Sequence, residues 1–384
     1  MTEEWVGPSA ITGALVMDAG GSFGYRGTVT IDGGRFAGFA DDVVPESNSF
    51  DARGCWVIPG VYDCHTHLTW SDFHSHDRER HSAAEAAAHT AAALTATLRA
   101  GVTSARDAGG ATAELAGAIA ANTLAGPRLQ VSVNMIGPEV AGSVSGVSDA
   151  VRAALDSGAQ WIKLLATGGV ATAGDAVLAS YFTTREIEAA IGVAAARGVR
   201  VMVHSWGGDS LDAAIGAGAA SIEHGIHLTP DQARRAAAAG TTFVPTLTVY
   251  RQVQQMVHAG ELPGVAPERI DAAVAVHQRA VLHARDAGLA IALGSDFGTA
   301  RQHGTNLIEI ASLIRAGLTG PEALIAATRS GALLLGDGGS GRIAAGDRAD
   351  AVILDADPHD PHTYESGAHV RAVLKDGRFV YRAG

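Results

Sequence analysis

The stretch "GVYDCHTHLTW" at residues 60–70 places two histidines, His65 and His67, one residue apart after an apolar run. Side chains alternate between the two faces of a strand, so both imidazoles point the same way. Two imidazoles on one face, with the carboxylate of Asp63 behind them, form a candidate metal-binding pair. A pair of surface histidines is the alternative interpretation, and the rest of the chain has to decide between the two.

Composition narrows the class of protein. The chain has 384 residues, of which 47% are hydrophobic and 18% charged, and its net charge of -12 comes from scattered acids. These values are typical of a globular protein with one large or two smaller domains, and they disfavour nucleic acid as a partner. The first ten residues lack the apolar core of a secretory signal, and no apolar run is long enough to span a membrane. We therefore expect a soluble, cytoplasmic protein.

The central part of the chain alternates apolar runs with alanine-rich helical runs. The helical runs cover residues 83–100, 185–197, 209–217, 268–286 and 306–316. The candidate strands are residues 56–65, 102–108, 129–136, 161–168, 200–206, 220–226, 242–249 and 290–296. Eight strand–helix units of this kind predict an α/β fold, a (β/α)8 TIM barrel over residues 57–339. Short strands with glycine-rich turns at both termini, residues 1–56 and 340–384, predict a small composite β-sandwich domain.

Metal-competent side chains recur where these candidate strands end. They are His65, His67, Lys163, His204, His224 and Asp296. One such residue in an apolar strand is usually a satisfied core group. Here five of the eight candidate strands carry His, Lys or Asp near their C-terminal ends, which is hard to attribute to packing. A buried lysine, in addition, is costly unless it is neutralised or paired. Because the C-terminal ends of barrel strands meet at one face, these residues predict an active site there.

Several motifs resemble those of the amidohydrolase superfamily over nearly the whole length. They are "IPGVYDCHTH", "IKLLATGG", "VMVHSW", "SIEHG", "LGSDFG" and "GRIAAGDRADAVILDADP". The chain is most similar to the branch with a lysine on the fourth strand, which includes prolidase-like and Xaa-Arg dipeptidase-like enzymes.

This resemblance implies a binuclear site with two divalent metal ions, of which zinc is the commonest. His65, His67 and Asp296 would bind the more buried ion, and His204 and His224 the more exposed one. Lys163 would bridge both ions as a carbamate formed with carbon dioxide, because a desolvated lysine loses its proton readily. A metal-bridging hydroxide would then attack the scissile carbonyl, with Asp296 as the catalytic proton carrier.

Four further residues are candidate substrate contacts: Tyr250, His303, Trp206 and Arg106. Two of them have a competing interpretation: Trp206 could pack in the core, and Arg106 could form a salt bridge with an acid of the protein. The chain also departs from the dipeptidase pattern in two places. It has no Thr-Gly-Gly-His type segment after the third strand, and it has Trp206 where those relatives tend to have a histidine. Both positions border the expected pocket, which leaves the substrate open.

The leading functional hypothesis is hydrolysis of an amide C–N bond in a dipeptide, an N-acyl amino acid or a related small carboxamide. A cyclic amide hydrolase or deaminase is the second hypothesis, although deaminase-like members generally lack the strand-four lysine. Cleavage of a carbamate, a urea or a lactone is a further possibility. A non-enzymatic scaffold is disfavoured because every ligand position is filled. The family resemblance also implies a homo-oligomer.

Overall fold

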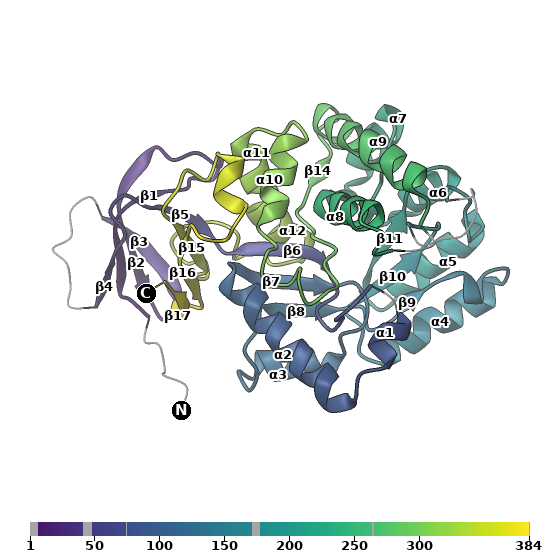
Figure 1. The fold of residues 1–384 in the computed structure, drawn as a ribbon, viewed down its shortest axis with the longest axis horizontal. Coiled ribbons are helices and arrows are strands. Elements are labelled where there is room, and N and C mark those ends of the chain that lie inside the picture. Colours follow the sequence, from purple (N-terminus) through teal and green to yellow (C-terminus); the bar gives the residue numbers. More distant parts are fainter. Residues whose placement is uncertain (1–6, 41–47, 74, 171–176, 263–264, 384) are drawn as a thin grey trace.

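The computed structural model describes residues 7–40, 48–73, 75–170, 177–262 and 265–383. The fold is α/β, with parallel strands and helices in the middle of the chain and a separate sheet built from both ends (Figure 1). In the part of the chain that the structure describes, no helix combines the length and the apolar character that a membrane crossing needs.

The two ends of the chain share one eight-stranded sheet with the order β17-β16-β15-β5-β1-β2-β3, in which β4 pairs with β1. Its pairs are antiparallel except that β1 runs parallel to β4 and β5. Apolar side chains from both ends pack into one core here, including Ile11, Val29, Ile353 and Leu374. The strands are β1 (Ala10–Val16), β2 (Tyr25–Asp32), β3 (Arg35–Ala40), β4 (Ser49–Asp51), β5 (Trp56–Pro59), β15 (Ala351–Leu354), β16 (Val370–Lys375) and β17 (Arg378–Arg382).

The central strands form two parallel sheets, ordered β6-β7-β8 and β14-β13-β12-β11-β10-β9. Backbone hydrogen bonds join β6 to the segment after β14, from Cys64 N to Leu293 O at 2.8 Å and from Asp296 N to His65 O at 2.7 Å. The ends of these two segments therefore lie side by side. The strands are β6 (Val61–Thr66), β7 (Val102–Asp107), β8 (Arg128–Val131), β9 (Met135–Ile136), β10 (Trp161–Leu165), β11 (Arg200–Ser205), β12 (Ser221–His224), β13 (Thr242–Val244) and β14 (Ala290–Ile291).

Two of the predicted strands divide. The run at 56–65 breaks at Gly60, so that β5 belongs to the sheet of the two ends and β6 to the parallel strands. A side chain at Gly60 would meet Thr103 Oγ1 at 2.2 Å, so only glycine fits this crossing point. The run at 129–136 breaks between β8 and β9, where Val133 has a φ of 62°. A left-handed residue interrupts the extended backbone that a strand requires.

The helices that were predicted from the sequence are confirmed to within two residues at each end. Capping boxes fix the starts of four helices, as Ser82 and Glu85 do for α2. The helices are α1 (Ser75–Glu79), α2 (Ala83–Arg99), α3 (Ala113–Ala120), α4 (Val144–Asp156), α5 (Thr184–Ala195), α6 (Asp209–Ala217), α7 (Pro230–Ala239), α8 (Leu247–His258), α9 (Pro267–Asp286), α10 (Ile308–Arg315), α11 (Gly320–Ile325) and α12 (Gly331–Leu334).

The predicted strand at 242–249 is too long, because β13 ends at Val244 and α8 begins at Leu247. The carboxylate of Glu309 on α10 accepts hydrogen bonds from the amides of Leu247 and Thr248, at 2.7 and 2.8 Å. These are amides of the first helical turn, which have no partner within the helix. A buried acid from a distant segment thus starts α8, which the local pattern did not reveal.

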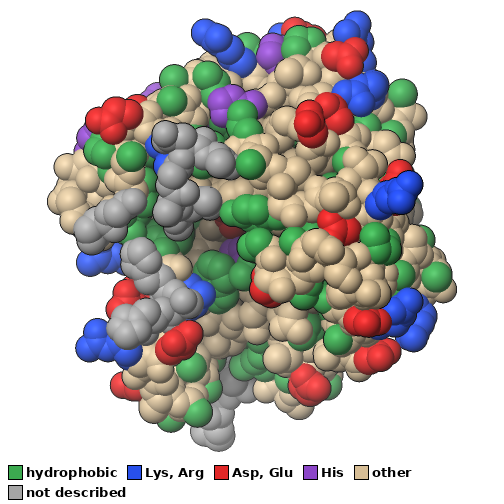
Figure 2. Space-filling model, turned by 90° about the vertical axis from the view of Figure 1, so that its right-hand side faces the viewer, with side chains coloured by type: hydrophobic (Ala, Val, Ile, Leu, Met, Phe, Trp, Pro, Cys, Tyr) green, Lys and Arg blue, Asp and Glu red, His purple; other side chains and the backbone are tan. Residues whose placement is uncertain are grey.

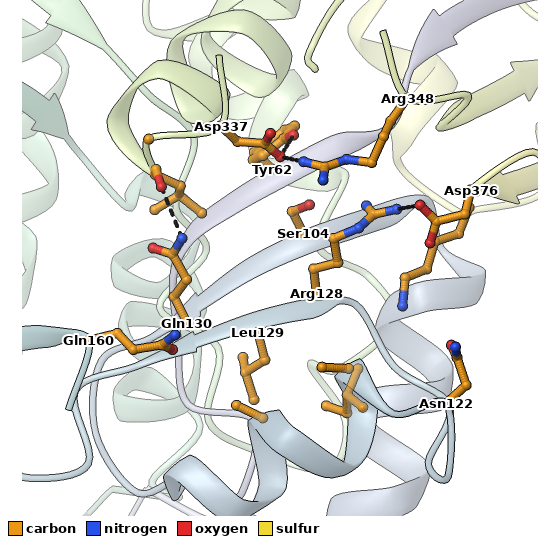
Figure 3. Close-up of a pocket in the computed structure, with 16 residues that line it drawn as sticks. Tyr62, Ser104, Asn122, Arg128, Leu129, Gln130, Gln160, Asp337, Arg348 and Asp376 are labelled. Carbon is orange, nitrogen blue, oxygen red and sulfur yellow. Dashed lines mark hydrogen bonds and ion pairs between the residues drawn. The ribbon is translucent and has the colours of Figure 1, made fainter. Parts of the chain in front are cut away.

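Paired charges join the sheet of the two ends to the starts of the parallel strands. Arg128, at the start of β8, pairs with Asp350 and Asp376, while Asp337 pairs with Arg348 and accepts a hydrogen bond from Tyr62 (Figure 3). All of these groups except Asp350 line a cavity of about 490 Å³. Its two arginines pair with acids, and Lys375 donates to the carbonyl of Gly126 at 2.8 Å, so we interpret the cavity as a structural seam between the terminal sheet and the parallel strands.

Substituting Arg128→Met should destabilise the protein, because Asp350 is only 3% exposed and would lose the guanidinium that pairs with it. A buried charge without its partner costs about 3–5 kcal/mol. Arg152→Met is the matched control, since Arg152 pairs with Asp149 on an exposed helix face, where a loss below about 1 kcal/mol is expected. Urea unfolding of the three proteins measures the difference, and equal midpoints for the two variants would contradict this account of the seam.

Candidate metal centre

All six residues that were predicted as metal ligands line one cavity of about 350 Å³. His65 lies in β6 and His67 just after it, while Lys163, His204 and His224 come from β10, β11 and β12. Asp296 follows β14. On the face shown in Figure 2 the molecule is hollowed, with hydrophobic side chains around the hollow and histidine within it. The structure thus brings together side chains that lie up to 231 positions apart in the sequence (65 to 296).

Three of these residues form a compact ligand set. His65 Nε2 and His67 Nε2 each lie 3.3 Å from Asp296 Oδ1. The potential ligand atoms of the three residues all lie within 4.8 Å of one another. Lys163 Nζ lies 3.2 Å from His65 Nε2. Two imidazoles and a carboxylate at this spacing suit zinc and other first-row divalent ions.

His204 and His224 lie beside this set. Their ring centroids are 4.5 Å apart, and His224 Nδ1 lies 3.9 Å from Asp296 Oδ2. Asp296 therefore has His65 and His67 near one carboxylate oxygen and His224 near the other. This arrangement fits a carboxylate positioned between two groups of ligands.

Each imidazole is held by the protein through one ring nitrogen. His65 Nδ1 bonds Glu223 at 2.6 Å, His67 Nδ1 the carbonyl of Gly109 at 2.9 Å, His204 Nε2 that of Gly168 at 2.9 Å and His224 Nδ1 the hydroxyl of Thr246 at 2.7 Å. The second ring nitrogen is then the candidate metal-binding atom: Nε2 of His65 and His67, which lies 3.3 Å from Asp296 Oδ1 in both, Nδ1 of His204 and Nε2 of His224. Metal-binding histidines are typically oriented in this way.

The backbone is strained at two of the six positions. His224 has a φ of 70° and Asp296 a φ of 55°, values that are uncommon for residues other than glycine. Such strain persists only where the surroundings enforce it, and it clusters at functional sites. It also explains how Glu223 and His224, adjacent in the sequence, can both approach His65.

Burial sets the protonation states of the ligands. It lowers the pKa of Lys163 to about 8 and, together with the charge of Lys163, the pKa of His204 to about 4. Burial and the neighbouring His204 hold the pKa of His224 well below its usual value. For Asp296 burial acts in the opposite direction, but the neighbouring His65 and His67 outweigh it and lower the pKa. Burial thus disfavours the protonated forms of Lys163, His204 and His224, while Asp296 stays ionised. These are the forms that bind metal, so these donors fit a metal site.

Glu223 is a functional residue that the sequence reasoning missed. It is fully buried and accepts hydrogen bonds from Arg106 at 2.8 Å, from His65 and from Ser221. The charges of Arg106 and His65 outweigh burial and lower the pKa of Glu223, so it is a carboxylate. A charged residue inside the buried strand "SIEH" was the available signal.

The four predicted substrate contacts have different surroundings. Tyr250 lines the cavity, and its hydroxyl accepts a hydrogen bond from Trp206 Nε1 at 2.9 Å. Trp206 itself is 1% exposed and packs in the core behind Tyr250. His303 bonds the carbonyl of Trp70. Arg106 uses its donors on Cys64 O, Ser221 and Glu223, so its partners belong to the protein.

Asp63 was predicted to place its carboxylate behind the two histidines that follow it. Its Oδ1 accepts from the amides of His65 and Ser295, at 3.2 and 3.0 Å, and its Oδ2 from Ser295 and Asn306 side chains. It contacts the backbone rather than an imidazole. It therefore positions the segments that carry His65 and Asp296 relative to each other.

Comparison with known proteins gives the family. The model of the amidohydrolase family matches residues 56–380. The chain belongs to this family. The resemblance seen in the sequence is thus confirmed, and the protein is a hydrolase of carbon–nitrogen amide bonds. Members are generally metal-dependent, in agreement with the His65, His67 and Asp296 set.

Individual relatives support the same assignment. A protein of unknown activity from Mycobacterium tuberculosis is 32% identical over 78% of this chain and 79% of its own. The ochratoxinase of Aspergillus niger is 29% identical over 64% of this chain and 51% of its own. The structure of a prolidase complexed with N-methylphosphonate-L-proline has a TM-score of 0.86 and 28% identity, and covers 97% of this chain and 99% of the prolidase.

Replacing Glu223 by glutamine should weaken metal binding, because His65 loses the carboxylate that orients it and Arg106 keeps no ionic partner. Loss of such an outer partner typically costs about 10–100-fold in metal affinity. Competition with a chromophoric chelator for zinc measures the affinity, and circular dichroism confirms folding. Glu188→Gln, an exposed position on α5, is the control. Unchanged affinity in a folded Glu223→Gln protein would rule out this role.

Proposed function

We propose that the protein is a binuclear metal-dependent amidohydrolase that cleaves the amide C–N bond of a small carboxamide, such as a dipeptide or an N-acyl amino acid. The observation that carries the proposal is the convergence of His65, His67 and Asp296 with Lys163 in one cavity. His204 and His224 complete the ligand set. These residues would hold two divalent ions, which we propose to be zinc, and Lys163 would bind them as a carbamate made from carbon dioxide.

When bound, such ions lower the pKa of water and polarise an amide carbonyl. The chain supplies the remaining functions. Asp296, ionised and close to His65 and His67, is placed to accept a proton from the attacking water and to return it to the leaving nitrogen.

Tyr250 would act on the substrate directly. Its hydroxyl accepts from Trp206, so the hydroxyl proton is left to donate, and the residue lines the cavity next to His224, with ring centroids 5.6 Å apart. A donor in this position can stabilise negative charge that develops on a carbonyl oxygen.

Three wider assignments belong to the same proposal. The parallel strands form one (β/α)8 barrel over residues 57–339, and residues 1–56 with 340–384 form a composite β-sandwich domain. The strand β5 (Trp56–Pro59) belongs to the terminal sheet, so this sheet extends three residues past the proposed boundary between residues 56 and 57. The cytoplasmic location and the homo-oligomeric state stay predictions.

The alternative is hydrolysis of a cyclic amide, a carbamate or a lactone at the same site. One relative, the imidazolonepropionase of Myxococcus xanthus, is 39% identical over 101 residues, which are 26% of this chain. The lysine in the ligand set favours the amidase proposal over deamination.

The test uses the fact that the chain contains only two lysines, Lys163 and Lys375. In protein equilibrated with ¹³C-labelled carbon dioxide and zinc, a single carbamate signal in ¹³C NMR is expected. Lys163→Ala should remove this signal, reduce bound zinc from two ions per chain and abolish amide hydrolysis, whereas Lys375→Ala should keep all three. Full zinc content and activity in Lys163→Ala would disprove the bridging carbamate.

A panel of dipeptides, N-acyl amino acids, neutral carboxamides, cyclic amides, carbamates and lactones, assayed for product formation by the zinc-loaded protein, tests the reaction itself. Hydrolysis of any of the first three classes that disappears on zinc removal supports the proposal. Turnover confined to cyclic amides, carbamates or lactones would favour the alternative.

Tyr250→Phe should lower kcat/KM about 10–1000-fold with zinc content unchanged, because it removes one donor to the developing oxyanion. Tyr381→Phe, in β17, is the control at a distant tyrosine. Steady-state kinetics give kcat/KM for both variants and the wild-type protein. A wild-type kcat/KM in Tyr250→Phe would exclude this donor role.

A further inference from the structure

We infer that the part of the substrate held beside the metal centre is uncharged and apolar. The substrate class is then a neutral carboxamide with an aromatic or branched aliphatic group, rather than a peptide with a free carboxylate in the cavity. The inference rests on the proposed function and narrows its substrate.

The cavity has two parts: a polar floor, made of the six candidate metal ligands, and an apolar wall, made of the remaining lining residues. Beyond the six ligand positions, the described lining is mostly hydrocarbon, and its polar side-chain groups are the hydroxyl of Tyr250 and the indole N–H of Trp70. The wall residues are Trp70, Phe73, Met135, Leu165, Gly169, Val170, Val249, Tyr250, Val253, Leu262 and Val265. A cavity of about 350 Å³ accommodates a small molecule, and apolar walls with few polar groups are typical of such sites.

The described lining offers no cation for a substrate carboxylate. Lys163 is its sole Lys or Arg, and it belongs to the proposed metal ligands. Two ranges that the structure does not describe, 171–176 and 263–264, contain neither Lys nor Arg in their sequence.

Two arginines lie close to the centre, and both are bound to protein atoms. Arg78 stacks over Trp70, with its Cζ 3.9 Å from the ring centroid, and donates to the carbonyls of Asp72 and Phe73 at 2.7 and 2.8 Å. Arg106 is fully buried against Glu223. Neither arginine is among the residues that line the cavity, so a carboxylate against the apolar wall would be desolvated without a cationic partner in the described lining, which is strongly unfavourable.

The apolar wall is also preformed. Val249, Tyr250 and Val253 project from α8 and pack with Leu262 in one hydrophobic cluster. Trp70 stacks on His67 at a centroid distance of 3.8 Å and an interplanar angle of 14°. Because His67 and Arg78 occupy its faces, Trp70 presents its edge, which favours an edge-to-face contact with a substrate ring.

Binding tests the inference without any turnover. The probes are N-benzylmethanesulfonamide, which is neutral and resists hydrolysis, and its analogue with a para-carboxylate on the ring. Calorimetric titration of the zinc-loaded protein should show the neutral compound binding at least about 10-fold more tightly, since only the carboxylate is desolvated. Equal binding, or tighter binding of the carboxylate, would overturn the inference and leave the proposed hydrolytic function standing.

A second test measures whether a cation introduced into the cavity lining reverses the preference for a neutral substrate. The wild-type protein should hydrolyse N-benzylacetamide with a kcat/KM at least about 10-fold above that of 4-(acetamidomethyl)benzoate. Met135→Lys places a cation on a side chain of similar length in the lining, and should reduce or reverse this preference. Met135→Gln adds polarity without charge and should keep it. An unchanged preference in Met135→Lys would count against the inference, and failure to hydrolyse either amide would count against the proposed function alone.

Discussion

The carboxylate of Glu223, buried between the guanidinium of Arg106 and the imidazole of His65, is the interaction on which the metal centre depends. These side chains come from β12, β7 and β6, so the contact exists only when three separate strands are in register. A carboxylate and a guanidinium at zero exposure are tolerable only as partners. Once they are paired, His65 has one orientation, and its Nε2 points to Lys163 and Asp296.

A second constraint links the same ligands through the backbone. Asp63 accepts hydrogen bonds from the amides of His65 and Ser295, and so joins the end of β6 to the segment that carries Asp296. The left-handed backbone of Asp296 is kept in place by such contacts. The site is therefore rigid before any metal or substrate binds, and little reorganisation is needed during catalysis.

The cavity combines this polar floor with an apolar wall, and the two depend on each other. Burial lowers the pKa values of Lys163 and His204, which keeps them in metal-binding forms. Hydrophobic residues that line the same cavity, such as Val249 and Leu262, form the surface that a substrate would contact. A charged substrate group that contacted this apolar surface would lose its hydration without gaining a polar partner. The charged seam around Arg128 belongs instead to the other ends of the strands, where it joins the terminal sheet.

The sequence by itself predicted the α/β class and the helices from local periodicity, the family from its motifs, and the six candidate ligand positions from polar residues at strand ends. His65 and His67 share a face through the two-residue repeat of a strand, and apolar runs that end in His, Lys or Asp are visible without a structure.

Only the tertiary structure decided the rest. Glu223 acquires its role from Arg106 and His65, 117 and 158 positions away in the sequence. Tyr250 reaches the cavity on a helix that Glu309, from another element, helps to start. The apolar wall draws residues from five separate segments, and no local pattern specifies which side chains will meet across a cavity.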